Sequence, residues 1–160
     1  MKKIILILDN IRSVHNVGSL FRTADGFGVS EIFLCGTTPT PIDRFGRERS
    51  DFKKVSLGAE KTISWKYFET TEQAILFSKQ EGFQILALEQ SERSQNLNTF
   101  VSEKNLALVL GTEVTGMSQE LLNYCDVILE IPMFGSKESF NVSIAGAIAM
   151  YELSQNKKSA

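Results

Sequence analysis

Short apolar runs recur along the chain, each bounded by polar or turn-forming residues. They are rich in Ile, Val and Leu, and too short for ordinary helices, which is typical of strands buried on both faces of a parallel sheet. The pattern predicts strands at residues 3–8, 31–35, 83–88, 106–110 and 127–131.

The intervals between these runs have helical periodicity. In residues 16–27 the apolar side chains recur at i, i+3, i+4, i+7 and i+10, which places them on one stripe of a helix. Ser118 is a predicted helix N-cap, with Met117 and Leu122 placed to pack against each other across it. Two further helices are predicted at residues 71–81 and 140–155.

Alternating strands and helices predict an α/β domain with a mostly parallel sheet and helices on both faces. No internal repeat, low-complexity tract or flexible linker interrupts the 160 residues, so we expect a single domain over residues 1–160. The apolar core of the N-terminus, residues 4–8, is too short for a signal peptide, and no later run is long enough to cross a bilayer.

The two cysteines, Cys35 and Cys125, cannot build a disulfide framework, which favours a reducing compartment and a cytoplasmic location. Both lie in apolar runs and are expected to pack as small hydrophobic residues. With one histidine in the chain, no Cys/His set has metal-ligand spacing, so no metal is predicted.

Ligands of parallel α/β sheets bind beyond the carboxyl ends of the strands. Residues 9–15, 111–117 and 132–139 each follow a predicted strand and lead towards a helix, so these three segments are the candidate site. The glycines at 26 and 28 follow a helix and precede a strand, the reverse of the dinucleotide-binding order, and no Walker A loop is present. An NAD or ATP site is therefore disfavoured.

The first helix carries Gly18 and Arg22 one turn apart and off its apolar stripe. Gly18 leaves a gap through which another backbone or a ligand can approach, and Arg22 is either a ligand-facing or an ordinary surface arginine. His15 is a possible base, although a lone histidine in a loop is usually just solvated. Glu113 follows a buried strand and either pairs with an arginine, holds a ligand or forms a turn.

Ser139 and Asn141 open the last predicted helix, which is rich in alanine and glycine over residues 145–149. Small side chains permit close approach of another element, either within the core or in a partner molecule.

The net charge is −2, which argues against a protein that coats nucleic acid non-specifically. Residues 43–54 are an exception, because five cations there face three acids. This stretch is either a solvated loop or a local contact for nucleic acid. The cations are Arg44, Arg47, Arg49, Lys53 and Lys54.

Three segments together resemble the SpoU/TrmH group of the SPOUT RNA methyltransferases, in family order and at family spacing. They are NIRSVHNVGSLFRTADGFGV (10–29), LVLGTEVTGMSQELL (108–122) and EIPMFGSKESFNVSIAGAIAMYE (130–152). The resemblance implies methyl transfer from S-adenosylmethionine to a ribose 2′-hydroxyl of RNA, and the minimal architecture of the chain favours tRNA over rRNA. It also implies a deep C-terminal trefoil knot around the cofactor and a homodimer, while no separate RNA-binding domain is expected.

By the same resemblance, the cofactor is expected to contact Leu88, Gly111, Ile131, Met133 and Ser139. The catalytic residues are expected to be Asn16, Arg22, Glu113, Ser139 and Asn141. An arginine matching Arg22 is often assigned as the base, yet a guanidinium normally stays charged in proteins. The alternative is that Arg22 grips the target phosphate, held by Asn16 and Glu113, while Ser139 and Asn141 organise the cofactor loop.

RNA binding is then assigned to the cations of residues 44–54, combined across a dimer, or to a partner. Two alternative functions stay open. One is a non-catalytic module that binds RNA or S-adenosylmethionine, and the other is a knotted methyltransferase that modifies a base.

Overall fold

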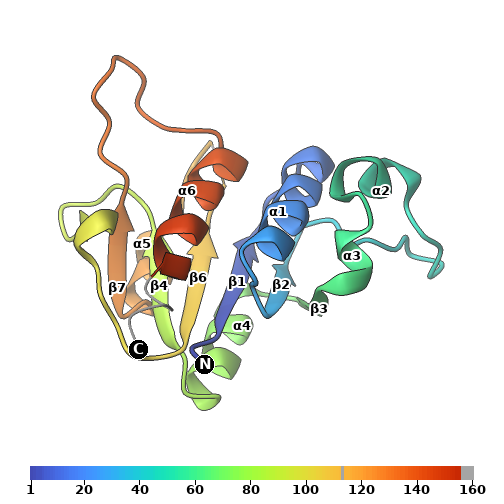
Figure 1. The fold of residues 1–160 in the computed structure, drawn as a ribbon, viewed down its shortest axis with the longest axis horizontal. Helices are drawn as coiled ribbons and strands as arrows, with labels where there is room; N and C mark the ends of the chain where they lie inside the picture. The colour runs from blue at the N-terminus through green and yellow to red at the C-terminus, as the bar shows by residue number, and fades with distance from the viewer. Residues whose placement is uncertain (113, 156–160) are drawn as a thin grey trace.

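The computed structural model describes residues 1–112 and 114–155 and contains one seven-stranded sheet in the order β3-β2-β1-β6-β4-β7-β5 (Figure 1). All neighbouring strands pair in parallel, which confirms the predicted α/β class. The strands are β1 Ile4–Asp9, β2 Glu31–Cys35, β3 Ser64–Phe68, β4 Gln84–Leu88, β5 Gln95–Asn96, β6 Leu106–Leu110 and β7 Val127–Glu130.

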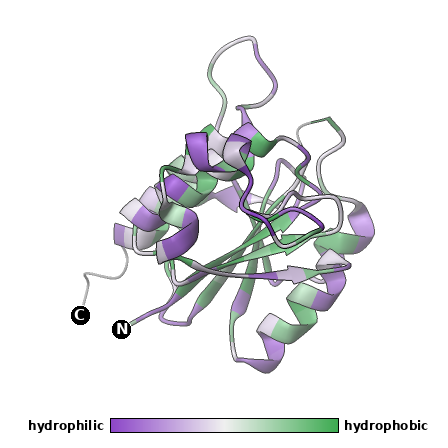
Figure 2. Ribbon diagram, turned by 90° about the vertical axis from the view of Figure 1, so that its right-hand side faces the viewer, coloured by the Kyte–Doolittle hydropathy of each residue, from purple (hydrophilic) through white to green (hydrophobic). Residues whose placement is uncertain are grey.

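Helices cover both faces of the sheet (Figure 2), and apolar side chains of these helices are buried against it. One core cluster joins the sheet to α1, α2, α3 and α6, and a second joins its other face to α4 and α5. The helices are α1 Val14–Gly26, α2 Ser50–Ser56, α3 Ala59–Thr62, α4 Thr71–Gln80, the 3₁₀ turn η1 Leu97–Thr99, α5 Gln119–Asn123 and α6 Val142–Gln155.

The centre of the sheet consists of β1, β6 and β4, and every residue of β1 and β6 is buried. Alternate residues of β1 belong to the two core clusters, as in Ile7 on one face and Leu6 on the other. Burial on both faces explains why these strands read as continuous apolar runs and why the sequence predicts them well.

Two edge strands, β3 and β5, were not predicted. In β3 the residues are exposed or half-buried, and its Lys66 pairs with Glu31 of β2 at 2.9 Å. The helix α2, residues Ser50–Ser56, was not predicted either. A seven-residue helix is too short to show periodicity, although its Phe52 is buried edge-on against Phe21 with ring centroids 5.2 Å apart.

Two helices begin at other residues than predicted, because capping side chains determine where each helix starts. Ser13 accepts a hydrogen bond from Asn16 N at 3.1 Å, so α1 begins at Val14 and not at residue 16. Asn141 Oδ1 accepts from Ser143 N at 2.9 Å, so α6 begins at Val142 and not at residue 140. The predicted cap at Ser118 is confirmed, since its hydroxyl accepts from Leu121 N at 3.1 Å.

Both cysteines are reduced, and burial raises the pKa of each thiol to about 12. Cys35 is fully buried and Cys125 is half-buried. No helix in the described part of the chain is long and apolar enough to span a membrane. Within residues 1–112 and 114–155, no three His, Cys, Asp or Glu side chains come together as a metal site.

Gly18 brings two helices together. A Cβ atom at Gly18 would lie 2.9 Å from Val55 Cβ and 3.4 Å from the carbonyl oxygen of Phe52, both on α2. The gap expected beside Arg22 is thus filled by the backbone of α2. Gly146 of α6 is similar, because its Cβ would lie 2.6 Å from Leu20 Cδ2 and 2.9 Å from Leu110 Cδ1. Close packing within the chain therefore accounts for this small residue of α6.

Replacing Gly18 by alanine is expected to lower the free energy of unfolding by about 1–3 kcal/mol, since the new methyl overpacks the contact with α2. Gly26→Ala is the matched control, because it lies in the same helix and nothing lies within 4 Å of its Cβ position. There alanine should stabilise the helix by up to about 1 kcal/mol. Thermal unfolding of the two variants should give shifts of opposite sign, and equal shifts would contradict the packing account.

Candidate active site

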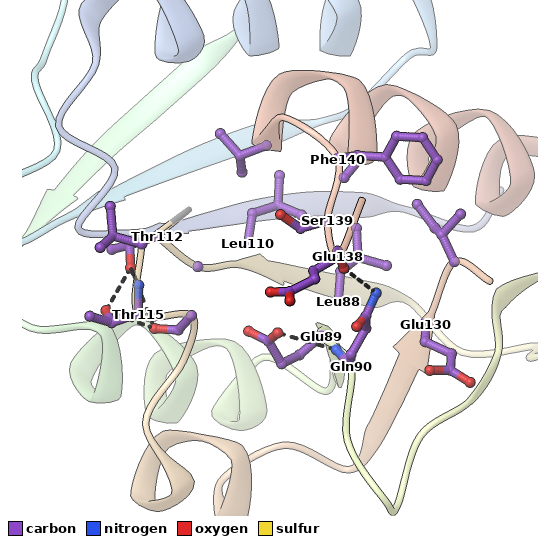
Figure 3. A pocket seen from close by; sticks show the side chains of 16 residues that line it. Leu88, Glu89, Gln90, Leu110, Thr112, Thr115, Glu130, Glu138, Ser139 and Phe140 are labelled. Carbon is purple, nitrogen blue, oxygen red and sulfur yellow. Dashed lines mark hydrogen bonds between the residues drawn. The ribbon is translucent and has the colours of Figure 1, made fainter. Parts of the chain in front are cut away.

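A cavity of about 390 Å³ opens at the carboxyl ends of three neighbouring strands, β6, β4 and β7 (Figure 3). Four of the five residues expected to bind the cofactor line it, and they come from segments far apart in the sequence. They are Leu88, Gly111, Ile131 and Ser139. Met133, the fifth, is half-buried in the segment after β7 and is not among the lining residues.

The wall after β6 is shaped by two glycines that leave no room for a side chain. A Cβ at Gly111 would lie 2.7 Å from Met117 Cγ and 3.2 Å from Met117 N. Gly116 has φ +64°, and its Cβ would lie 2.6 Å from a carboxylate oxygen of Glu89. A side chain at either position would collide with Met117 or Glu89, so both positions require glycine.

Glu89 is a cavity residue that the sequence did not predict. Its carboxylate accepts hydrogen bonds from Met117 N at 3.0 Å and from Gln90 N at 3.2 Å, and it lines the cavity. Its position directly after the buried strand β4 was the available signal, since side chains at that edge face ligands.

The cavity is acidic. Glu89, Glu130 and Glu138 line it, and the side chain of Gln90 donates to the Glu138 carbonyl at 2.9 Å, as the dashed line in Figure 3 marks. Carboxylates repel a phosphate but attract positive charge and accept hydrogen bonds from hydroxyls. The chemistry of this wall therefore suits a ligand with a cationic group and hydroxyl donors better than a nucleoside phosphate.

Two of the expected catalytic residues meet directly. Asn141 Nδ2 donates to Asn16 Oδ1 at 3.3 Å, which ties the start of α6 to the start of α1. Asn16 is buried and lines a second cavity of about 1030 Å³. This second cavity adjoins the first and shares its wall, residues 112 and 114–116. Glu113, also expected in the catalytic set, lies outside the described residues.

Arg22 lies elsewhere. It is exposed on α1 and lines a third cavity of about 730 Å³, together with His15, Lys54 of α2 and Ile144 of α6. No described residue lines both this cavity and the acidic one. The structure thus brings Asn16 to Asn141 and Ser139 to the acidic cavity, but it leaves Arg22 apart from them.

Residues 43–54, the stretch rich in arginine and lysine, form a loop and most of α2. Acidic side chains within this stretch form ion pairs with several of its cations. Arg47 pairs with Asp43 at 3.0 Å and Arg49 with Asp51 at 2.8 Å. Glu48 lies 3.8 Å from Lys53 and 3.1 Å from Lys61. Exposed pairs of this kind are screened by water, so the charges remain available to another ligand.

The chain belongs to the SpoU rRNA methylase family, whose model matches residues 3–151. The tRNA (guanosine(18)-2′-O)-methyltransferase of Aquifex aeolicus is 29% identical over 98% of this chain and 71% of its own length. The enzyme of that name from Borreliella burgdorferi is 30% identical over 92% of this chain and 64% of its own length. An AdoMet-bound rRNA methyltransferase from Sinorhizobium meliloti has a TM-score of 0.86 and 26% identity, covering 99% of this chain and 57% of its own.

The chain thus spans 57% to 71% of the length of these relatives. Each relative contains residues beyond the matched region, so its activity as a whole protein does not pass directly to this chain.

Proposed function

We propose that this protein transfers a methyl group from S-adenosylmethionine to a ribose 2′-hydroxyl of RNA, with tRNA favoured over rRNA. The observation that carries the proposal is the acidic cavity, because Leu88, Gly111, Ile131 and Ser139 line it together. Relatives named as tRNA (guanosine(18)-2′-O)-methyltransferases support the reaction, and the AdoMet-bound Sinorhizobium meliloti enzyme supports the cofactor.

The residues present fit such a cofactor. Gly111 brings backbone close to the cavity, and Glu89 and Glu138 supply acceptors for hydroxyl and ammonium donors. When bound, the cofactor supplies a methyl group on a positively charged sulfur, which is already a good electrophile. The protein therefore has mainly to align the ribose hydroxyl with this methyl and to provide an acceptor for the hydroxyl proton.

Arg22 is the proposed substrate clamp. Its guanidinium is exposed and can bind a phosphate through two parallel N–H donors. A guanidinium is a poor base, so the phosphate or a water molecule is the proposed proton acceptor. Asn16 and Asn141 hold the starts of α1 and α6 in register, and Ser139 helps to shape the cofactor cavity.

We propose that the working form is a homodimer whose active site combines two copies. Arg22 lines a different cavity from the cofactor residues of its own chain, so a second copy is the natural source of the clamp. Exposed apolar side chains of α6 support this arrangement. Ile144 lines the cavity of Arg22 and is 53% exposed, and Tyr151, which packs against the lining residue Phe27, is 51% exposed. Light scattering on the purified protein should then give twice the chain mass of 17.9 kDa.

Three further features are proposed on the family resemblance. The segment between β7 and α6, which projects from the molecule in Figure 1, belongs to a C-terminal trefoil knot around the cofactor. Residues 1–160 act as one methyltransferase domain in the cytoplasm. The cations Arg44, Arg47, Arg49, Lys53 and Lys54 bind RNA. The hydrogen bond from the Gln90 side chain to the Glu138 carbonyl supports the proposed knot, because it ties the segment between β7 and α6 to the end of β4.

Transfer of labelled methyl from S-adenosylmethionine to unmodified bulk tRNA and, separately, to rRNA tests the reaction. The labelled RNA is then digested with alkali, and label is expected in resistant dinucleotides, because a 2′-O-methyl blocks attack by the neighbouring hydroxyl. Label released as ordinary mononucleotides would mean base methylation. Cofactor binding without transfer to either RNA would favour a non-catalytic binding module.

A further inference from the structure

The side chain of Phe45 is exposed to solvent, and the guanidinium groups of Arg44 and Arg47 lie over its ring. Phe45 is 65% exposed, at the tip of the loop between β2 and α2. The guanidinium carbons of Arg44 and Arg47 lie 4.8 Å and 4.9 Å from its ring centroid. Phe45 belongs to neither core cluster of its own chain, so its ring is accessible to a ligand.

The loop is held in one conformation by its own hydrogen bonds. Asp43 Oδ1 accepts from Phe45 N at 2.8 Å and from Arg47 N at 2.9 Å, and Asp43 N donates to the Arg47 carbonyl at 2.8 Å. The hydrogen bonds from the backbone of Arg47 and Phe45 also lower the pKa of the Asp43 carboxyl. Gly46, at φ +77°, closes the turn. Phe45 is therefore presented by a preorganised loop, which reduces the entropy lost on binding.

The surroundings carry positive charge. Over residues 43–54 five cations exceed three acids, in a chain whose net charge is negative. The loop leads into α2, whose Lys54 lines the same cavity as Arg22. In Figure 1 the loop lies at the opposite side of the molecule from β7, whose carboxyl end lines the acidic cavity. A polyanion bound at Phe45 can thus follow α2 towards Arg22 and stay clear of the acidic wall of the same chain.

We propose that Phe45 is a stacking platform for one unpaired base of the RNA, with Arg44 and Arg47 binding the phosphates on either side of that base. Single-stranded RNA is commonly bound in this way, by an aromatic ring under a splayed base and cations along the backbone. The Phe45 ring is 65% exposed with two guanidiniums lying over it, so one loop offers an aromatic surface and cations together. The choice of RNA as ligand rests on the proposed function.

The test measures binding of a short unstructured RNA and of inorganic polyphosphate, which carries charge but no bases. Phe45→Ala is expected to weaken RNA binding about tenfold, within the range for loss of one stacked base, and to leave polyphosphate binding unchanged. Phe45→Trp should retain RNA binding because it keeps an aromatic face. Arg44→Gln should weaken both ligands. Leu76→Ala, at an exposed apolar residue of α4, is the control and should change neither.

Equal RNA affinity for the wild type and Phe45→Ala would overturn the platform, and so would an equal loss of RNA and polyphosphate binding. Methyl transfer by the wild-type protein is assayed in parallel. If RNA is methylated but Phe45→Ala binds it normally, this inference alone fails. If no RNA is methylated but the base-dependent loss is seen, the proposed reaction fails and the platform stands.

Discussion

Replacing Arg22 by alanine is expected to lower the rate of methyl transfer about 100-fold or more, while binding of S-adenosylmethionine stays at the wild-type level. The rate falls because the ribose hydroxyl loses the clamp that aligns it, and small misplacements of reacting groups cost about this much. Cofactor binding persists because Arg22 does not line the acidic cavity. Single-turnover methylation of RNA and calorimetric titration of the cofactor measure the two effects.

Two variants sharpen this prediction. Arg22→Lys keeps the charge but loses the two-pronged donor geometry, so it should recover only part of the rate. Arg93→Ala is the matched control, since it removes an exposed arginine that bonds Asn123 near α5. The clamp role is wrong if Arg22→Ala transfers methyl at the wild-type rate, or if Arg93→Ala is as slow.

Replacing Gly111 by valine is expected to weaken binding of S-adenosylmethionine by about 10- to 100-fold. The new side chain collides with the backbone nitrogen and side chain of Met117, so residues 111–117 must shift, and overpacking of this kind costs about 1–3 kcal/mol. The displaced segment is a wall of the acidic cavity. Equilibrium dialysis with labelled cofactor measures the loss, and a circular dichroism melt shows whether the variant is folded.

Gly135→Val is the matched control, because nothing lies within 4 Å of its Cβ position and it is not a lining residue. Unchanged cofactor affinity is expected there. If Gly111→Val binds S-adenosylmethionine as tightly as Gly135→Val and the wild type do, the acidic cavity is not the cofactor site.

The same two variants also test the composite site. Subunits of Arg22→Ala and Gly111→Val, mixed and allowed to exchange, form dimers in which one site combines an intact clamp with an intact cavity from the other chain. Methyl transfer by the mixture should then rise well above the rate of either variant alone at the same cofactor concentration. No recovery after demonstrated exchange would place the clamp and the cofactor in one chain.

The sequence predicts the central strands of the sheet but not its two edge strands. The strands β1 and β6 are buried on both faces, so their apolar runs are unambiguous. The edge strand β3 is exposed and carries Lys66, and β5 has only two residues, so neither leaves a pattern. Helix boundaries depend on individual caps such as Ser13, which periodicity alone does not locate.

The candidate site also has parts that the sequence predicts and parts that it does not. The loops that follow β6 and β7 were predicted because strand ends are where sheets bind ligands. Glu89 was missed because its role depends on a contact with Met117, 28 positions along the chain. The separation of Arg22 from the cavity was also out of reach, because motif order along a chain does not reveal which side of a helix meets which cavity.

The position of β6 in the sheet has a consequence for how the chain folds. This strand lies between β1 and β4, and the backbone nitrogen of Lys3 bonds the side chain of Asn105, 102 residues later. Closing so long a loop is entropically costly, and sheets built from such distant pairs fold slowly. During synthesis one edge of β1 can pair with β2, but its other edge has no strand to pair with until β6 leaves the ribosome. The half-made protein therefore exposes an apolar strand edge, and we expect it to depend on chaperones more than its small size suggests.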